Sequence, residues 1–358
     1  MHRTFWAVAL SFMLGSVAQA GINPYNLDLI AEPLNRPWAV VALPDDRFIV
    51  TEMHGTLAIV SPTGEITRST PDLPKLYAKA QGGFLDIALT QDFALSGKVM
   101  LTYAAGSPDK NVLVVASAEL TDDGLQNVRP VFQVNDAKDT PVHYGGRLGV
   151  LNDGTWLVTT GDGFDYREHA QILTSQMGKV LHLREDGQAP QVSPFSDAPY
   201  VYSLGHRNPQ GLVVDSETGT IYELEHGPDG GDEINVIEAG KNYGWPVITK
   251  GVDYSGAKIT PYTEYPGMEQ PLVNWTPSVA PSSMALYQKD MFPSLKGKML
   301  VTTLKSKALF AVDLDTGESE HIVPELKERL RDVIVAEDGS ILILTDRNNA
   351  KLYRISAK

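Results

Sequence analysis

Short apolar runs alternate with polar turns along this chain, and the same arrangement recurs six times with drifting sequence. One copy reads RNPQGLVVD, SETG, TIYELEHG, which is a polar lead, an apolar run, a turn and a second apolar run. The copies begin near Arg36, Gln81, His143, Arg207, Pro281 and Arg329. Short runs bounded by Asp, Gly and Pro predict β-strands joined by tight turns, because these residues adopt the backbone angles that turns require.

The repeat predicts an all-β fold, and specifically a six-bladed β-propeller. Its interval is roughly 40–70 residues, which suits radially arranged blades of about four strands each. A β-sandwich is the alternative, but six similar polar lead-ins favour radial repetition. No linker divides the chain, so we expect one propeller domain over residues 21–358, with long inter-strand insertions at 179–201 and 250–275.

The first 20 residues predict a cleaved signal peptide. They place Arg3 before an apolar run from Phe5 to Leu14 and end in Ala-Gln-Ala, which is typical of secretory signals. A buried first helix is the alternative. No later segment is long and apolar enough to predict a membrane span, so we expect export from the cytoplasm.

The amino-acid composition excludes several kinds of site and partner. The chain has no Cys, which excludes disulfides, a thiolate nucleophile and thiolate metal ligands. Without residues 1–20, which contain one Arg, the 30 Lys and Arg become 29 against 44 Asp and Glu, a formal charge of −15. An acidic chain of this kind is a poor candidate for binding nucleic acid or anionic membranes.

The polar lead-ins predict a ligand site at the propeller axis, because equivalent positions of successive blades surround that axis. They contain Gln81, His143, Arg207 with Asn208, and Arg329 with Arg331; at strand ends lie Asp162, Gly227 with Pro228, and Lys305. Buried cations need anionic partners, and guanidinium groups bind carboxylates or phosphates bidentately. The ring therefore predicts an anionic ligand.

His143 is the candidate general base. An imidazole accepts protons near neutral pH, and Asp162, at the end of the following strand, is placed to orient it. His206 and His226 are rival candidates, and a purely structural histidine is the other interpretation. The chain contains no phosphate loop, no HExxH and no GxSxG, so nucleotide-binding, zinc-protease and serine-hydrolase chemistry have no motif support.

The segment from Leu204 to Pro246 contains an acidic, Gly-rich loop, HGPDGGDEIN. A tight set of turns is one interpretation. A cation site is the other, since Glu233, the Tyr243 carbonyl and Asp253 offer the hard oxygen ligands that suit Ca²⁺ rather than Zn²⁺.

Seven short motifs, in order along nearly the whole chain, carry a family resemblance: QGGFLDIAL, HYGGRL with GDG, GHRNPQGL, EHGPDGGDEIN with NYGWP, APSS, TLKSKAL, and RLRDV with LTD. The chain resembles the soluble aldose sugar dehydrogenases that depend on pyrroloquinoline quinone (PQQ), also called the soluble glucose dehydrogenase family, and within it the shorter bacterial periplasmic members.

The resemblance implies a six-bladed propeller with PQQ at the axial mouth and a periplasmic location. His143 matches the base that takes the anomeric proton while hydride passes to C5 of the quinone, and Asp162 matches its orienting carboxylate. Arg207 matches a residue near the reducible carbonyl. The matching cofactor-binding positions are Gln81, Arg207, Asn208, Lys305, Arg329 and Arg331, with Tyr254 bordering the cofactor. The Gly227 and Pro228 carbonyls match ligands of a Ca²⁺ beside the quinone, and Glu233, Tyr243 and Asp253 match a second, structural Ca²⁺ site.

These observations lead to the hypothesis of a periplasmic quinoprotein that oxidises aldose sugars to lactones and passes electrons to a separate acceptor. A metal-dependent propeller lactonase and a non-enzymatic sugar- or protein-binding propeller are the alternatives. A lactonase would need an axial Ca²⁺ lined by carboxylates, and it would have no use for the surrounding cations. The second would have no use for His143 beside Arg207 and Lys305.

Overall fold

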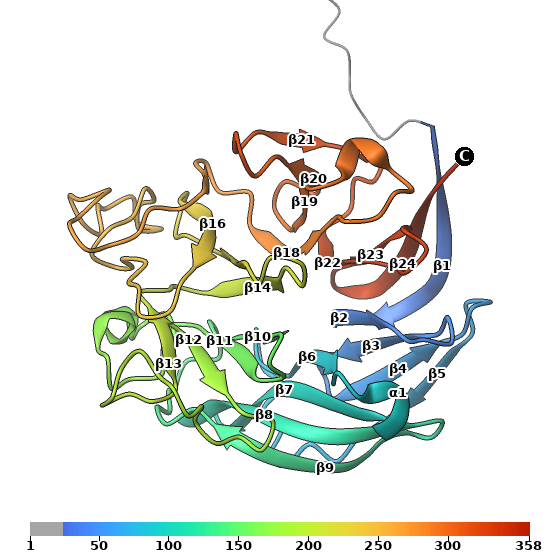
Figure 1. Ribbon diagram of the computed structural model, residues 1–358, viewed down its shortest axis with the longest axis horizontal. Helices are drawn as coiled ribbons and strands as arrows, with labels where there is room; N and C mark the ends of the chain where they lie inside the picture. The colour runs from blue at the N-terminus through green and yellow to red at the C-terminus, as the bar shows by residue number, and fades with distance from the viewer. Residues whose placement is uncertain (1–23) are drawn as a thin grey trace, which may run out of the picture.

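Six four-stranded antiparallel sheets surround a central axis in the computed structural model, which describes residues 24–358 (Figure 1). This confirms the prediction of a six-bladed β-propeller. The predicted signal peptide, residues 1–20, lies outside the described residues. No described helix is both long and apolar enough to cross a membrane.

The strands follow the chain order, four to a blade. Blade 1 contains β2 (Pro37–Ala42), β3 (Phe48–Glu52), β4 (Thr56–Val60) and β5 (Ile66–Ser69). Blade 2 contains β6 (Phe84–Leu89), β7 (Lys98–Ser107), β8 (Lys110–Thr121) and β9 (Gly124–Gln133), with helix α1 (Phe93–Ser96) between the first two strands. Blade 3 contains β10 (Gly145–Val150), β11 (Trp156–Thr160), β12 (Lys179–Leu183) and β13 (Val201–Leu204), with a 3-10 turn at Arg167–Gln171.

Blades 4 to 6 also contain four strands each. Blade 4 contains β14 (Pro209–Val214), β15 (Ile221–Glu225), β16 (Asp232–Ile237) and β17 (Val273–Trp275). Blade 5 contains β18 (Pro281–Leu286), β19 (Met299–Thr303), β20 (Leu309–Val312) and β21 (Ser319–His321), with a 3-10 turn at Pro293–Leu295. Blade 6 contains β22 (Leu330–Val335), β23 (Ile341–Thr345), β24 (Asn348–Ala357) and, from the other end of the chain, β1 (Tyr25–Asn35).

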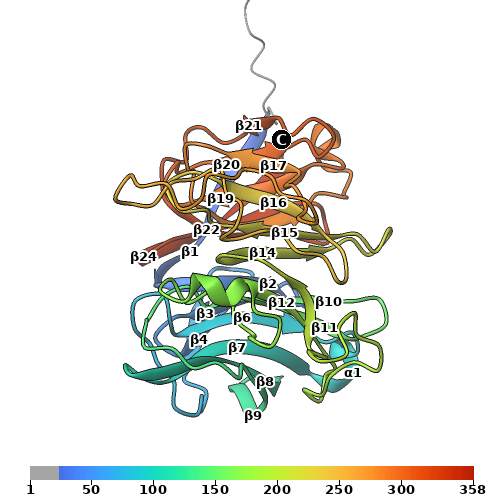
Figure 2. The same cartoon turned by 90° about the vertical axis from the view of Figure 1, so that its left-hand side faces the viewer.

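The two ends of the chain close the ring. β1 pairs antiparallel with β24, with Tyr25 opposite Ala357, and the two strands lie side by side in both views (Figures 1 and 2). Pairing of the terminal strands joins the last blade to the first and covers an edge of β24 that would otherwise be unpaired.

The first strand of every blade lies nearest the axis and carries a register irregularity close to its start. These irregularities fall at Pro37/Ala39, Phe84/Ile87, Gly145/Leu148, Pro209/Gly211, Pro281/Ser283 and Leu330/Asp332. A bulge bends a strand and changes the direction of its side chains. The six bulges therefore direct the polar lead-ins toward the axis.

Apolar side chains fill the spaces between neighbouring blades. Leu85 and Leu113 of blade 2, for example, share one buried cluster with Leu148 and Val158 of blade 3. Burial of such residues is the main favourable term holding the blades together.

Arg147 joins the blades at the axis. It lies on β10 and is buried, and it contacts one residue from each of the other five blades: Trp38, Asp86, Gln210, Ser282 and Asp332. Its ion pairs measure 3.4 Å to Asp86 and 3.1 Å to Asp332, and its Nε donates to the Gln210 carbonyl at 2.6 Å. The burial of Asp86 raises the pKa of this carboxyl to about 6 despite the Arg147 charge.

The two expected insertions are shorter than the sequence predicts. The first five residues of 179–201 form β12, and the last three of the other insertion form β17. β12 is the third strand of blade 3 and β17 the outermost strand of blade 4, and a short strand beside a long loop has a weak periodic signal.

Candidate active site

His143 lies in the turn that leads into β10. Its φ of 52° is left-handed, a conformation that costs a non-Gly residue roughly 1–2 kcal/mol. The backbone N–H of His143 donates to Gln81 Oε1 at 2.8 Å. A Cβ at Gly161 would lie 2.3 Å from the His143 carbonyl oxygen, so glycine at that position lets the two turns approach each other. The surrounding structure thus holds His143 in a conformation it would not adopt alone.

Asp162 holds the ring of His143. His143 Nδ1 lies 2.7 Å from Asp162 Oδ1, which also accepts the Phe164 N–H at 2.7 Å. The other oxygen, Oδ2, accepts the Trp245 indole N–H at 2.7 Å. Burial would raise the pKa of Asp162, but the hydrogen bond and charge of His143, together with the Arg207 charge, leave that pKa below its usual range.

The ionised carboxylate defines the state of the imidazole. With Asp162 accepting at Nδ1, the proton of neutral His143 resides there and Nε2 keeps its lone pair. Burial lowers the pKa of His143, although Asp162 opposes that shift. His143 is therefore neutral at pH 7 and competent to accept a proton at Nε2.

Arg207 lies beside this pair and is also buried. Its Nη1 donates to the Gly227 carbonyl at 2.6 Å and to the His226 carbonyl at 3.1 Å, and its Nη2 lies 3.4 Å from the Tyr254 hydroxyl. These acceptors carry no formal charge, so the guanidinium remains a source of positive potential next to His143.

An axial cavity of about 290 Å³ opens between the lead-ins. Four of the predicted cofactor-binding residues line it, namely Gln81, Asn208, Arg329 and Arg331. Arg329 Nε and Arg331 Nη2 share the Asp346 carboxylate, at 2.9 and 2.8 Å.

The axial cavity has an excess of positive charge. Its lining also contains Arg36 and Arg347, so four guanidinium groups face the single carboxylate of Asp346 and three positive charges are left over. His226 adds none, because burial and the Arg207 charge lower its pKa to about 3. A compact ligand with several negative charges fits such a cavity.

A second hollow, of about 340 Å³, adjoins the His143–Asp162 pair, and we call it the loop cleft. The predicted residues that line it are Asp162, Arg207, Pro228, Asp253 and Tyr254. Phe164 and Trp245, which were not predicted, line it as well.

Phe164 is the clearest residue that the sequence did not reveal. Its ring lies edge-on to His143, with the centroids 5.2 Å apart, and is stacked with Tyr254 at 6.3 Å. Phe164 is 43% and Tyr254 64% exposed. The one signal in the sequence was the position of Phe164 directly after the GDG turn.

Lys305 stands apart from the other predicted cofactor residues. It follows Leu304, which lines the axial cavity, but its side chain is 58% exposed and its Nζ lies 3.8 Å from Asp229 Oδ1. The structure thus places Lys305 near the rim and not within the cavity lining.

The predicted calcium ligands fall into two groups. The Gly227 carbonyl is directed toward the site, since Arg207 donates to it, and Pro228 lines the loop cleft. Glu233 lies on β16 and accepts the Asn274 amide at 3.2 Å. Tyr243 donates its hydroxyl to the Val236 carbonyl, and Asp253 accepts two hydrogen bonds from Ser255. No hydrogen bond joins Glu233, Tyr243 and Asp253 within residues 24–358, so this second site stays a prediction.

The two rival histidines have other surroundings. His206 is fully buried and its Nε2 lies 2.8 Å from Ser203 Oγ. His226 is partly buried and lines the axial cavity. Among the described residues, neither has a carboxylate within hydrogen-bond distance of its ring, whereas His143 does.

The fold and the site define a six-bladed β-propeller with a base-competent histidine beside a cationic axial cavity. The chain belongs to the glucose/sorbosone dehydrogenase family, whose model matches residues 34–354. The predicted resemblance is therefore confirmed, and the protein is an oxidoreductase.

Three comparisons illustrate the relationship. The aldose sugar dehydrogenase YliI of Escherichia coli K12 is 33% identical over 371 residues, which cover all of both chains. The apo-form structure of the soluble aldose sugar dehydrogenase from E. coli is 32% identical, covers 93% of this chain and all of its own, and superposes with a TM-score of 0.88. The PQQ-bound aldose sugar dehydrogenase from Streptomyces coelicolor is 25% identical, covers 94% of this chain and 99% of its own, and has a TM-score of 0.76.

Proposed function

We propose that this protein is a PQQ-dependent aldose dehydrogenase that oxidises aldoses at C1 to lactones. The observation that carries the proposal is the His143–Asp162 pair beside an axial cavity with three excess positive charges. Removal of a hydride from C1 and a proton from the anomeric hydroxyl leaves a carbonyl at C1, which is a lactone.

The residues present fit PQQ, which is a planar tricarboxylate. Three negative charges match the excess of positive charge in the axial cavity. Arg329 and Arg331 would bind carboxylates, and Gln81 and Asn208 would donate or accept hydrogen bonds. Arg207 and Tyr254 line the adjoining loop cleft, and Lys305 follows Leu304 of the axial cavity. When bound, PQQ supplies an ortho-quinone that accepts the hydride.

The residues of the chain supply the proton chemistry. His143 Nε2 would accept the anomeric proton, because Nδ1 is already committed to Asp162. The Asp162 carboxylate would stabilise the imidazolium that results, and Trp245 holds that carboxylate in place. Arg207 adds positive potential where negative charge develops during hydride transfer.

We extend the proposal to calcium. The carbonyls of Gly227 and Pro228 would bind one Ca²⁺ beside the cofactor, where it acts as a Lewis acid; the direction of the Gly227 carbonyl supports this. Glu233, the Tyr243 carbonyl and Asp253 would bind a second, structural Ca²⁺. Burial and the Glu225 charge raise the pKa of Glu233 to about 8, so a bound cation would also relieve an unfavourable carboxyl environment.

The location and the electron acceptor complete the proposal. The signal-like sequence of residues 1–20 supports export to the periplasm. A reduced cofactor must be reoxidised, so a separate quinone or redox protein has to take its electrons. The exposed aromatic side chains of the loop cleft favour an open site that admits several aldoses.

Reconstitution tests the proposed function. Purified protein, stripped of ligands, is mixed with PQQ and Ca²⁺, and reduction of an artificial dye is followed with a panel of aldoses. Aldose-dependent dye reduction that requires PQQ, together with release of lactone, is expected. Hydrolysis of a lactone without PQQ would instead support the lactonase. Failure to bind PQQ would overturn the proposal.

A further inference from the structure

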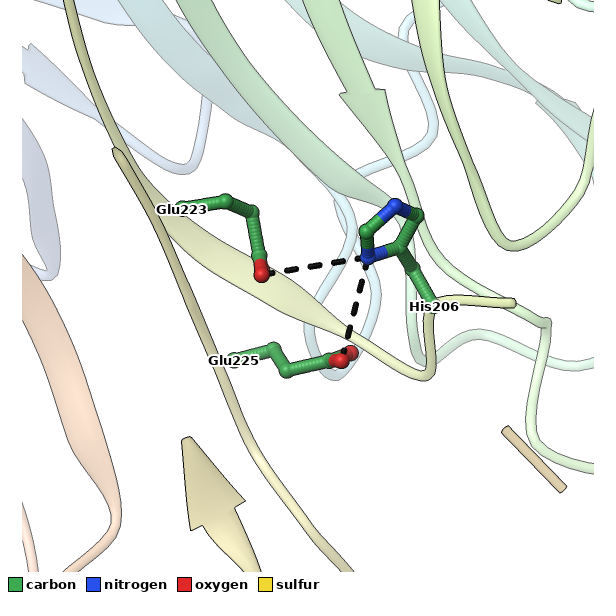
Figure 3. Close-up of side chains that lie close together, drawn as sticks. All are labelled: His206, Glu223 and Glu225. Carbon is green, nitrogen blue, oxygen red and sulfur yellow. Dashed lines mark ion pairs between the residues drawn. The ribbon is translucent and has the colours of Figure 1, made fainter. Parts of the chain in front are cut away.

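A group of buried polar residues lies inside blade 4, beneath the segment that carries Arg207 and Asn208. Glu223 and Glu225 point to the same side of β15, and His206 faces them from the segment between β13 and β14 (Figure 3). All three are buried. We refer to them as the His206 cluster.

The contacts within the His206 cluster are too long for hydrogen bonds. His206 Nδ1 lies 3.8 Å from Glu223 Oε2 and 3.8 Å from Glu225 Oε1, and the three atoms lie within 4.8 Å of one another. Both His206 Nδ1 and Glu223 Oε1 are buried without a hydrogen-bond partner in the part of the chain that the structure describes. Unpartnered buried polar atoms are rare because each loses its hydration without replacement.

The neighbouring residues hold these atoms in place. Ser203 Oγ lies 2.8 Å from His206 Nε2 and so directs Nδ1 toward the carboxylates. The Asn235 amide donates to Glu223 Oε2 at 3.0 Å. Glu225 Oε2 accepts the backbone N–H groups of Arg207 and Asn208, which leaves Oε1 directed at His206. Oriented ligands supported in this way are a property of metal sites.

We propose that His206 Nδ1, Glu223 and Glu225 form a binding site for a divalent transition-metal ion of the Zn²⁺ type. An imidazole nitrogen with two carboxylates is a ligand set that Zn²⁺ accepts, at about 2.0–2.2 Å, whereas Ca²⁺ takes oxygen ligands only. Two carboxylates also balance the charge of the ion. The site therefore differs in chemistry and in residues from the proposed calcium sites at Gly227 with Pro228 and at Glu233.

The charges of the two carboxylates also favour a bound cation. Burial and the adjacent Glu225 charge raise the pKa of Glu223 well above its usual range. A dication between the two carboxylates would remove that repulsion.

The ion would have a structural role, and it would stabilise the adjacent segment that carries Arg207 and Asn208. Glu225 bonds to the backbone of Arg207 and Asn208, so an ion that fixes Glu225 also fixes the segment from which these two side chains extend. The inference does not depend on PQQ or on sugar oxidation.

Metal analysis of untagged, full-length processed protein tests the site. The protein is chelator-treated, refolded with Zn²⁺ or Co²⁺ and desalted, and bound metal is measured by mass spectrometry, with the visible absorption of Co²⁺ as a second readout. Glu223→Gln removes a ligand at nearly constant shape. The matched control is Glu217→Gln, an exposed carboxyl in the turn between β14 and β15 of the same blade.

About one Zn²⁺ per chain is expected for the wild type and for Glu217→Gln, with affinity at least about tenfold lower in Glu223→Gln. Equal affinity in Glu223→Gln and wild type would contradict the proposal. If that variant does not fold, X-ray anomalous scattering at the zinc edge on the wild type decides, because a peak between the three side chains is required and its absence overturns the site. None of these readouts uses PQQ or catalysis, so they remain decisive if the proposed function fails.

Discussion

Asp162 binds His143 through one carboxylate oxygen and Trp245 through the other, each at 2.7 Å. The three residues come from different turns of blades 3 and 4, so the orientation of the base depends on how these blades pack. A carboxylate held at both oxygens has little freedom to rotate, and the imidazole it holds keeps one tautomer.

Replacement of Asp162 by Asn tests this relationship. The amide keeps the shape but does not stabilise an imidazolium, so kcat with an aldose is expected to fall roughly 10²- to 10⁴-fold, with PQQ affinity within about threefold of wild type because Asp162 is not in the lining of the axial cavity. The control is Asp290→Asn at an exposed ion pair with Lys296. An unchanged kcat in Asp162→Asn would remove Asp162 from the proton chemistry.

The pH profile reports the state of His143. Burial lowers the pKa of this imidazole in the folded protein, and Asp162 partly restores it. The base is active when neutral, so kcat/KM should fall to half of its plateau only at a pH below 6.5, the ordinary pKa of a histidine. Asp162→Asn removes the opposing charge and should move the acidic limb lower still. An acidic decline of kcat/KM centred above pH 6.5 would contradict a lowered pKa of His143.

Phe164 is expected to act on sugar binding more than on turnover. Its half-exposed ring lies against His143 in the loop cleft, where an aromatic face contributes about 0.5–1.5 kcal/mol to a stacked contact. Phe164→Ala should therefore raise KM for aldoses by roughly two- to twelvefold, with a smaller rise in Phe164→Leu. Steady-state kinetics give the split between KM and kcat, and Leu95→Ala on exposed α1 is the control.

Arg331 is expected to determine cofactor affinity. Its side chain is 12% exposed, lines the axial cavity and pairs with Asp346 at 2.8 Å. Loss of a charged hydrogen bond is worth about 1.5–3 kcal/mol, so Arg331→Gln should weaken PQQ binding roughly 10- to 150-fold. Fluorescence titration of apoprotein with PQQ measures the change. Arg129→Gln on the exposed outer strand β9 should bind PQQ like the wild type.

Arg147 is expected to be the residue whose loss most weakens the ring. Its guanidinium lies between Asp86 and Asp332, and removal of one partner from a buried ion pair costs about 3–5 kcal/mol because the remaining charges are left uncompensated. Arg147→Met should lower the free energy of unfolding by that amount, as measured by urea denaturation. A loss below about 1 kcal/mol, the usual value for an exposed ion pair, would show that Arg147 does not join the blades.

The sequence by itself determined the six repeats, the all-β class and the family. Strand-length apolar runs and Asp-Gly turns are local signals, since each depends on a few neighbouring residues. The positions of Gln81, Asn208, Arg329 and Arg331 at one cavity also followed from the repeat, because equivalent positions of a propeller share an axis.

Only the tertiary structure decided which residues far apart in the chain meet. It pairs β1 with β24, places Trp245 on Asp162 and Phe164 on His143, and brings His206 to Glu223 and Glu225. Such contacts depend on bulge positions, strand register and the packing of one blade on the next. A local pattern of apolar and polar residues contains none of these distances, because a shift of one residue in register would preserve the pattern and turn each side chain to the other face.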